Sequence, residues 1–260
     1  MPKLVFPLVA KTDLWDNYGD PRGNGRHAGI DMENPWRAPV VAVEPGKVDY
    51  ATSNLGGCML YLYGRSGTMY MYIHLNNDLT PKNDNRGGCV EGTTYAVPDG
   101  SAVLTGEQIA FNGDSGDANG NPHLHFEVHP NGGTDTNPFS YLKRATKLLF
   151  AGREGKPFSL ALRGRVQSAG VETLKILATS VRSYPGGRWL EIDARPVEIG
   201  VPAQSAVEAQ LARLGAGTGL ATLKTQTRVA VYTAKARVTR DALVGAPGAL
   251  TASRISALNG

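Results

Sequence analysis

The chain has 260 residues, of which 41% are hydrophobic and 19% charged, and a formal net charge of +4 with a pI near 9.0. No apolar stretch approaches the roughly 20 residues that a membrane-spanning helix needs, so the composition argues against a membrane span. No basic run interleaved with aromatic residues is present, and we expect no nucleic-acid partner.

The first apolar residues are interrupted by Lys11, Thr12 and Asp13, which makes them too short for the core of a signal peptide. We interpret this in two ways. Either an export signal has been removed, or the protein leaves its cell by another route.

The pattern of β-prone runs in the first part of the chain predicts a mainly β domain over residues 1–148. Short β-prone runs lie at 40–43, 46–50, 59–63, 69–75 and 124–128. The turn-like residues 64–67 predict an antiparallel hairpin between two of these runs. Residues 76–103 are polar and rich in Gly and Asn, which predicts a long surface loop, and residues 138–150 predict a short helix.

A change in composition separates the two parts of the chain. All five histidines and both cysteines precede residue 145, and residues 149–158 read as a linker. Beyond it, β-prone runs lie at 159–166, 173–181, 189–194, 229–233 and 249–255, and residues 203–214 predict a helix. This pattern predicts a small β-barrel accessory domain over residues 159–260, with a weak similarity to OB-like barrels.

The two cysteines, Cys58 and Cys89, leave two alternatives open. They either form a disulfide that closes a loop of 31 residues or remain free thiols, because spacing does not show whether they meet.

Histidine spacing points to a metal. On a strand, residues two apart share a face, so His123 and His125 are expected to project side by side, with Glu127 continuing that face. His27 and Asp31 lie four apart and need a bend to meet, which Gly29 would permit. Together these motifs suit a single zinc ion, although spacing does not decide between His123 and His125 as a ligand.

Three further residues have ordinary structural interpretations. His129 reads as a solvated residue at the start of a turn, and Glu127 either orients a ligand histidine or serves as a structural hydrogen-bonding group. His74, by itself, reads as a packed core histidine.

The order of these motifs resembles the lysostaphin-type (LytM-type) zinc endopeptidases that act on bacterial peptidoglycan. The similarity runs from about residue 22 to residue 141. Its segments are GRHAGID (25–31), APVVA (38–42), PGKV (45–48), YIHL (72–75), TGEQIA (105–110) and NPHLHFEV (121–128).

The resemblance implies one zinc ion held by His27, Asp31 and His125, with His74 and His123 serving catalysis. It implies hydrolysis of peptide cross-links or stem peptides of peptidoglycan, by a protein that is secreted to the cell wall or periplasm or is carried on a phage virion. For residues 159–260 the sequence leaves three roles open: binding wall glycan, docking to a phage-tail or cell-wall protein partner, or acting as a spacer. The alternative is a non-catalytic family member that scaffolds another cell-wall enzyme.

The sequence departs from the family pattern in two places. Residues 76–103 are longer than the usual turn after the His-Leu pair and contain Cys89, and residues 54–58 replace the usual Gly-Asn before a strand. Both changes are expected near the substrate groove, so they bear on which peptide bond is cut.

Overall fold

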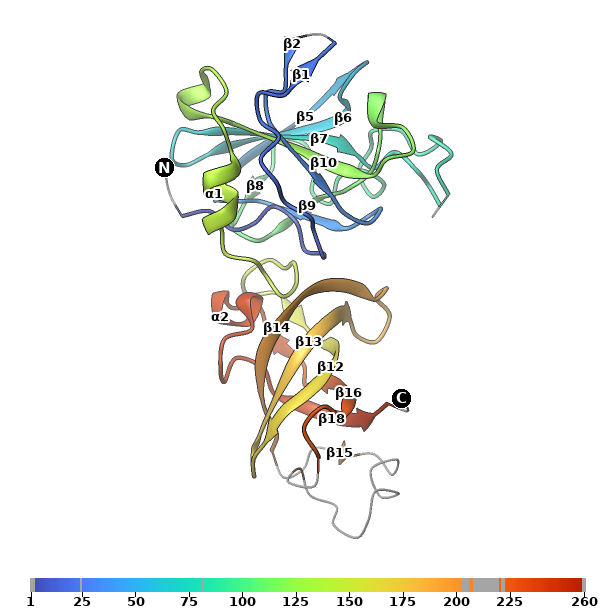
Figure 1. Ribbon diagram of the computed structural model, residues 1–260, viewed down its shortest axis with the longest axis vertical. Coiled ribbons are helices and arrows are strands. Elements are labelled where there is room, and N and C mark those ends of the chain that lie inside the picture. The colour runs from blue at the N-terminus through green and yellow to red at the C-terminus, as the bar shows by residue number, and fades with distance from the viewer. Residues whose placement is uncertain are drawn as a thin grey trace. The chain divides into compact units, whose positions relative to one another are not determined.

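The computed structural model describes residues 3–23, 25–80, 82–202, 206–207, 220 and 223–258 (Figure 1). It divides the chain into two compact units, Met1–Arg153 and Glu154–Gly260. This boundary falls among the residues 149–158 that the sequence predicts as a linker. In the described part of the chain, no helix is both long and apolar enough to cross a bilayer.

The first unit is built mainly of short strands. They are β1 (Pro21–Arg22), β2 (Gly25–Arg26), β3 (Ile30–Glu33), β4 (Pro39–Val41), β5 (Gly46–Ser53), β6 (Gly57–Gly64), β7 (Met69–Leu75), β8 (Ala102–Val103), β9 (Gln108–Phe111) and β10 (His123–His129). Its helical segments are the 3-10 turns η1 (Gly116–Ala118) and η2 (Pro130–Gly132) and the helix α1 (Phe139–Arg144).

Six of these strands form one antiparallel sheet, in the order β3-β10-β7-β6-β5-β8 (Figure 1). The predicted hairpin is confirmed, since β6 pairs with β7 and Tyr63 lies opposite Met69. The predicted mainly β, antiparallel fold class is therefore confirmed. Two smaller pairs, β1-β2 and β4-β9, complete the unit.

One face of the sheet carries the core. Leu60, Leu62, Tyr70, Tyr72 and Phe126 are fully buried on it. The Tyr72 hydroxyl accepts a hydrogen bond from the Val43 amide, so Tyr72 is a packing residue. Because strand side chains alternate, the residues between these core positions are directed to the opposite face, where the site lies.

The helix predicted over residues 138–150 is wrong in its extent. The structure has α1 over Phe139–Arg144, and Ala145 is already extended. The chain leaves the helix because the Thr146 backbone pairs with the N-terminal segment: its amide donates to Leu4 O and its carbonyl accepts from the Phe6 amide. Leu148 and Leu149 are then buried without helical structure.

Cys58 and Cys89 form a disulfide with a Cα–Cα distance of 5.2 Å, which resolves the alternative that the sequence left open. The bond ties the long loop after β7 to strand β6. Within that loop, the Asn83 side-chain amide donates to Asp114 and to Asn119, so the loop also supports residues 114–119.

We expect the double variant Cys58→Ala/Cys89→Ala to lower the free energy of unfolding by about 3–4 kcal/mol, because the disulfide restricts the unfolded chain across a 31-residue separation. Urea unfolding of the two proteins measures this difference. An unfolding midpoint equal to that of the parent would contradict the prediction.

The second unit is also mainly β. Among its described residues, the strands are β11 (Pro157–Phe158), β12 (Leu160–Ala169), β13 (Thr173–Ser183), β14 (Leu190–Gly200), β15 (Ala206–Val207), β16 (Arg228–Thr233), β17 (Ala236–Arg237) and β18 (Ala252–Ala257), and α2 (Arg240–Val244) is a helix. The main sheet has the order β14-β13-β12-β16-β18-β15.

This second sheet curls so that the end of β14 approaches the start of β18, but β14 and β18 do not form a strand pair. The Gly200 amide, at the end of β14, donates to Leu250 O near the start of β18, although three strands separate β14 and β18 in the sheet. A closed barrel stays a prediction. Most of the helix predicted over residues 203–214 lies outside the described residues, and where the chain is described, at Ala206–Val207, it forms β15 instead.

Candidate metal centre

Three side chains from two neighbouring strands meet at one point on the outward face of the first sheet. Asp31 on β3 lies directly opposite His125 on β10, so the two side chains form a cross-strand pair. His27 precedes β3, and the chain bends at Gly29 before the strand begins at Ile30. The bend expected from the sequence brings His27 back to Asp31.

Gly29 is required for another reason as well. A Cβ atom at this position would lie 2.5 Å from Phe126 O and 2.8 Å from His125 Nε2. The backbone before β3 therefore approaches β10 more closely than any side chain would allow. A glycine here sets the distance between the two halves of the site.

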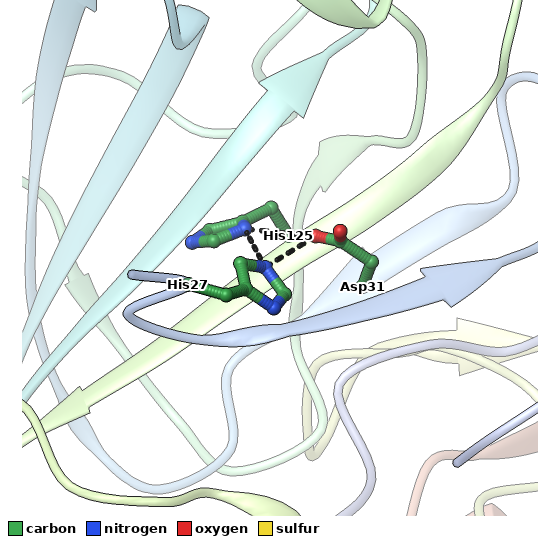
Figure 2. A group of neighbouring side chains, drawn as sticks. All are labelled: His27, Asp31 and His125. Atoms are coloured by element: carbon green, nitrogen blue, oxygen red, sulfur yellow. Dashed lines mark hydrogen bonds and ion pairs between the residues drawn. The ribbon is translucent and has the colours of Figure 1, made fainter. Parts of the chain in front are cut away.

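The three candidate ligand atoms form a compact triangle (Figure 2). His27 Nε2 lies 3.0 Å from Asp31 Oδ1 and 2.9 Å from His125 Nδ1, and His125 Nδ1 lies 2.8 Å from Asp31 Oδ1. A tetrahedral zinc ion with bonds of about 2.0–2.2 Å requires ligand atoms roughly 3.3 Å apart, which is close to this arrangement.

The positions of the ring protons of His27 and His125 favour a cation at the centre of this triangle, because the nitrogens that face it carry lone pairs. His27 Nδ1 lies 2.7 Å from Asn17 O, and because a carbonyl only accepts, His27 carries its proton on Nδ1 and presents a lone pair on Nε2. His125 Nε2 faces the Glu127 carboxylate at 2.9 Å, which fixes a proton there. Two nitrogen atoms and one carboxylate oxygen then converge as acceptors, and they fit a zinc ion.

The carboxylates around His125 also favour a second proton on its ring. Burial lowers the pKa of His125, but hydrogen bonds to Asp31 and Glu127 outweigh it and raise the pKa to about 9. Burial likewise raises the pKa of Asp31, but hydrogen bonds from His125 and His27 hold it well below its usual range. Metal binding at neutral pH must therefore displace a proton from His125.

Two residues that the sequence did not single out hold the ligands in place. Asn17 binds both backbone groups of Asp31, accepting from its amide at 3.1 Å and donating to its carbonyl at 3.2 Å. Arg22 donates to Asp31 Oδ2 at 2.8 Å, which leaves Oδ1 for the metal position. Neither residue belongs to a motif with a recognisable spacing, so only the structure reveals them.

Glu127 is a partner of His125, one of the two roles that the sequence left open. Its second carboxylate oxygen lies 2.7 Å from His129 Nε2, and His129 Nδ1 lies 2.9 Å from Gly133 O. The interpretation of His129 as a solvated surface residue is wrong, because its side chain is only 14% exposed. Alternation along β10 would have found it, since His123, His125, Glu127 and His129 are successive alternate positions.

His74 and His123 lie beside the triangle, with ring centroids 4.8 Å apart. His74 Nδ1 lies 2.8 Å from Ser115 O, and His123 Nδ1 lies 2.8 Å from Asn121 O. Both rings therefore hold a proton on Nδ1 and keep Nε2 as a base. His123 Nε2 is 3.7 Å from Asp31 Oδ1.

The backbone turns His74 toward the site. Tyr70 and Tyr72 face the core, and regular alternation would send His74 to the core as well. Instead, His74 has a φ of 62°, and the pairing of β6 with β7 shifts register between Cys58 and Leu60. This β-bulge redirects the imidazole to the outward face, a known use of bulges beside active sites.

These side chains line an open cleft of about 650 Å³. Its apolar floor consists of alternate residues of β6 and β7, namely Met59, Tyr61, Met71 and Ile73. Polar residues of the loop after η1, Asn119 and Asn121, line it together with Arg22 and Arg26 from the β1-β2 hairpin. An open cleft with one apolar surface suits an extended peptide chain beside the metal position.

The burial of His74 predicts an acid-sensitive stability. Burial, and then the nearby His123, lower its pKa from 6.5 to about 4. The unfolded chain therefore takes up a proton before the folded one does, so this contribution is complete above about pH 6.5 and is lost as the pH falls toward 4. In metal-free protein, we expect a loss of about 2–3 kcal/mol over this range.

Urea unfolding at several pH values, with the metal removed by EDTA, measures this dependence. Asparagine tolerates a positive φ, so His74→Asn is the matched comparison. The difference in stability between the parent and His74→Asn should change with pH between 4 and 6.5. A constant difference would show that His74 does not titrate as described.

Comparison with known proteins finds similarity over about half of the chain. No family model matches the chain. An uncharacterized metalloprotease of Haemophilus influenzae is 31% identical over 139 residues, which cover 53% of this chain and 25% of that protein. The chain therefore matches about a quarter of the length of this curated relative.

Two solved structures are also similar in sequence to about half of the chain. The catalytic domain of lysostaphin from Staphylococcus simulans is 28% identical, with 52% of this chain and 92% of that chain covered and a TM-score of 0.39. A zinc-containing peptidase from Vibrio cholerae is 25% identical, with 52% of this chain and 39% of that chain covered and a TM-score of 0.40.

The metalloprotease relative is consistent with the metal-binding motifs that lie between residue 22 and residue 141. In its first unit, the chain resembles the lysostaphin-type (LytM-type) zinc endopeptidases.

Proposed function

We propose that this protein is a zinc-dependent endopeptidase that hydrolyses peptide bonds in bacterial peptidoglycan, at its cross-links or stem peptides. The observation that carries the proposal is the convergence of three acceptor atoms, from His27, Asp31 and His125, beside two further imidazoles whose Nε2 atoms hold lone pairs. The site of action is then the cell wall or periplasm.

A single zinc ion bound by the three ligands would lower the pKa of a bound water toward 7 and polarise the scissile carbonyl. The chain's own residues have distinct roles around it. His74 and His123 are bases when neutral, and each is held by a backbone carbonyl through Nδ1, so each can take a proton on Nε2 and return it to the leaving amine.

Both imidazoles, once protonated, also provide N–H donors for the oxyanion of the tetrahedral intermediate. His123 is next to the metal position, with its Nε2 at 3.7 Å from Asp31 Oδ1, and His74 is further along the cleft, with its Nε2 at 3.8 Å from Asp117 Oδ1. This arrangement supports His123 acting at the reacting carbonyl and His74 at the adjacent proton transfer.

The cleft supports a peptide rather than a glycan as the part of peptidoglycan that is bound. Its floor of Met59, Tyr61, Met71 and Ile73 is largely apolar, whereas sugar hydroxyls require many polar partners. Leu55 and Gly56, in the segment that departs from the family pattern, also line the cleft. We therefore propose that this segment influences which peptide bond is cut.

The test is digestion of chemically defined peptidoglycan by the full chain, with the products identified by mass spectrometry and bound zinc measured by plasma mass spectrometry. We expect about one zinc ion per chain, cleavage of one peptide-bond type, loss of cleavage with chelator and recovery with added zinc. Stoichiometric zinc without any cleavage would favour a non-catalytic scaffold. Cleavage by metal-free protein would overturn the proposal.

A further inference from the structure

The net positive charge of the chain lies in its second unit. Glu154–Gly260 contains 14 Lys and Arg against 7 Asp and Glu, whereas Met1–Arg153 contains 13 against 16. The first unit is therefore slightly acidic, and the net charge of +4 arises entirely from the second. Such an asymmetry indicates an anionic partner for the second unit.

Arginines gather on one face of the second sheet. On β12, Leu160, Leu162 and Val166 are buried, so the alternate residues Arg163 and Arg165 are on the other face, and both are exposed. Strand pairing places Arg182 of β13 opposite Ala161, Arg228 of β16 opposite Arg165, and Arg254 of β18 opposite Tyr232. The positive charges thus extend across four adjacent strands.

Two guanidinium groups of this face share one aromatic ring. Arg163 lies 4.0 Å and Arg182 4.8 Å from the centroid of Trp189. Arg182 Nε is buried without a hydrogen-bond partner, and among the described residues neither arginine forms an ion pair with a carboxylate. Glu191 supplies a negative charge at the edge strand β14, opposite Ser180.

The like charges need an explanation, because a cross-strand pair such as Arg165 and Arg228 is repulsive in isolation. Guanidinium groups held on an aromatic ring keep their N–H edges available, and these edges match the oxygens of a phosphate. A bound phosphate at each position would remove the repulsion. The spread over four strands fits a chain of phosphates rather than a single ion.

We propose that the arginine face, defined as Arg163, Arg165, Arg182, Arg228 and Arg254, binds a linear phosphodiester polymer, with Arg163 and Arg182 holding its phosphates beside Trp189. Two aromatic rings of this face already carry arginines, since Arg163 and Arg182 share Trp189 and Arg254 lies 3.8 Å from the centroid of Tyr232; the Tyr184 ring, 5.0 Å from Tyr232, is 36% exposed. Nucleobases would need free rings for stacking. The polymer is therefore a polyol phosphate.

We take the source to be the polyol-phosphate polymer of the bacterial cell wall. This choice of source rests on the proposed peptidase function, whereas the anion site itself does not. The arginine face would then hold the whole protein on the wall while the first unit meets peptide.

The experiment measures binding of purified poly(ribitol phosphate) to the full chain by calorimetry at several salt concentrations. The test variant is Arg163→Gln/Arg182→Gln. The matched control is Lys224→Gln/Lys235→Gln, which removes the same charge from two exposed lysines between strands. We expect the test variant to bind about tenfold more weakly, with a smaller salt dependence, and the control to bind like the parent.

Single-stranded DNA of equal phosphate count and vesicles containing phosphatidylglycerol provide the competing anions. The proposal is overturned if either binds more tightly than the polyol phosphate, if the control variant loses as much affinity as the test variant, or if the polymer does not bind at about 150 mM salt. Cleavage of a short soluble peptide reports separately on the first unit, so failure of the arginine face is distinguishable from failure of the peptidase.

Discussion

Replacing His125 with alanine is expected to remove stoichiometric zinc and peptidoglycan cleavage together. The substitution deletes one of three ligand atoms, and it also leaves Asp31 and Glu127 facing each other across the vacated position without the ring that bonds to both. We expect the rate of cleavage to fall by at least about a thousandfold, since a zinc ion held by these ligands would supply the nucleophile and several kcal/mol of charge stabilisation. Zinc content and product release from defined peptidoglycan measure the two effects.

A variant of Glu127 distinguishes the loss of the ligand His125 from the loss of the hydrogen bond that orients it. Glu127→Gln keeps an oxygen that accepts from His125 Nε2 but removes the negative charge, so zinc affinity should fall by about 10- to 100-fold while cleavage persists at saturating zinc. Glu91→Gln, in the exposed loop that follows β7, removes an equal charge away from the site and should change neither. Normal zinc binding by His125→Ala would refute the assignment of the metal centre.

The ligand set illustrates what a sequence can predict. The alternation of His123, His125 and Glu127 follows from strand periodicity alone, and the structure places all three side chains at one cleft. The choice of His125 over His123 did not follow from spacing, because it depends on which ring lies opposite Asp31 in the register of β3 and β10. Register depends on how two strands pair, which the sequence of one strand does not show. Only the family resemblance pointed to His125 as the ligand.

Other features depend on contacts between segments far apart in the sequence. Asn17 acts through its side chain and its carbonyl at once, a role that no spacing rule anticipates. The helix predicted over residues 138–150 ends at Arg144 because Thr146 pairs with the N-terminal segment, a contact that local periodicity does not predict. In contrast, β12, β13 and β16 of the second unit lie close to the β-prone runs predicted at residues 159–166, 173–181 and 229–233.

Substitution of His74 or His123 is expected to stop turnover while zinc stays bound. Both are outside the ligand triangle, and each is fixed by a carbonyl that leaves Nε2 as the proton-accepting atom. Loss of a general acid-base group costs about 10²- to 10⁴-fold in rate, and we expect His74→Asn and His123→Gln each to lower kcat within this range. Zinc content should remain stoichiometric in both variants.

The design of these variants follows from the backbone. His74 has a φ of 62°, which asparagine adopts more readily than other residues with a side chain, so His74→Asn removes the imidazole while keeping the bulge that holds the end of β7. His74→Val serves as the contrasting variant, because a β-branched residue is strained at this φ and should lower stability as well as kcat. If His74→Asn retains kcat within about threefold of the parent, His74 is a structural residue of the bulge and His123 alone moves the proton.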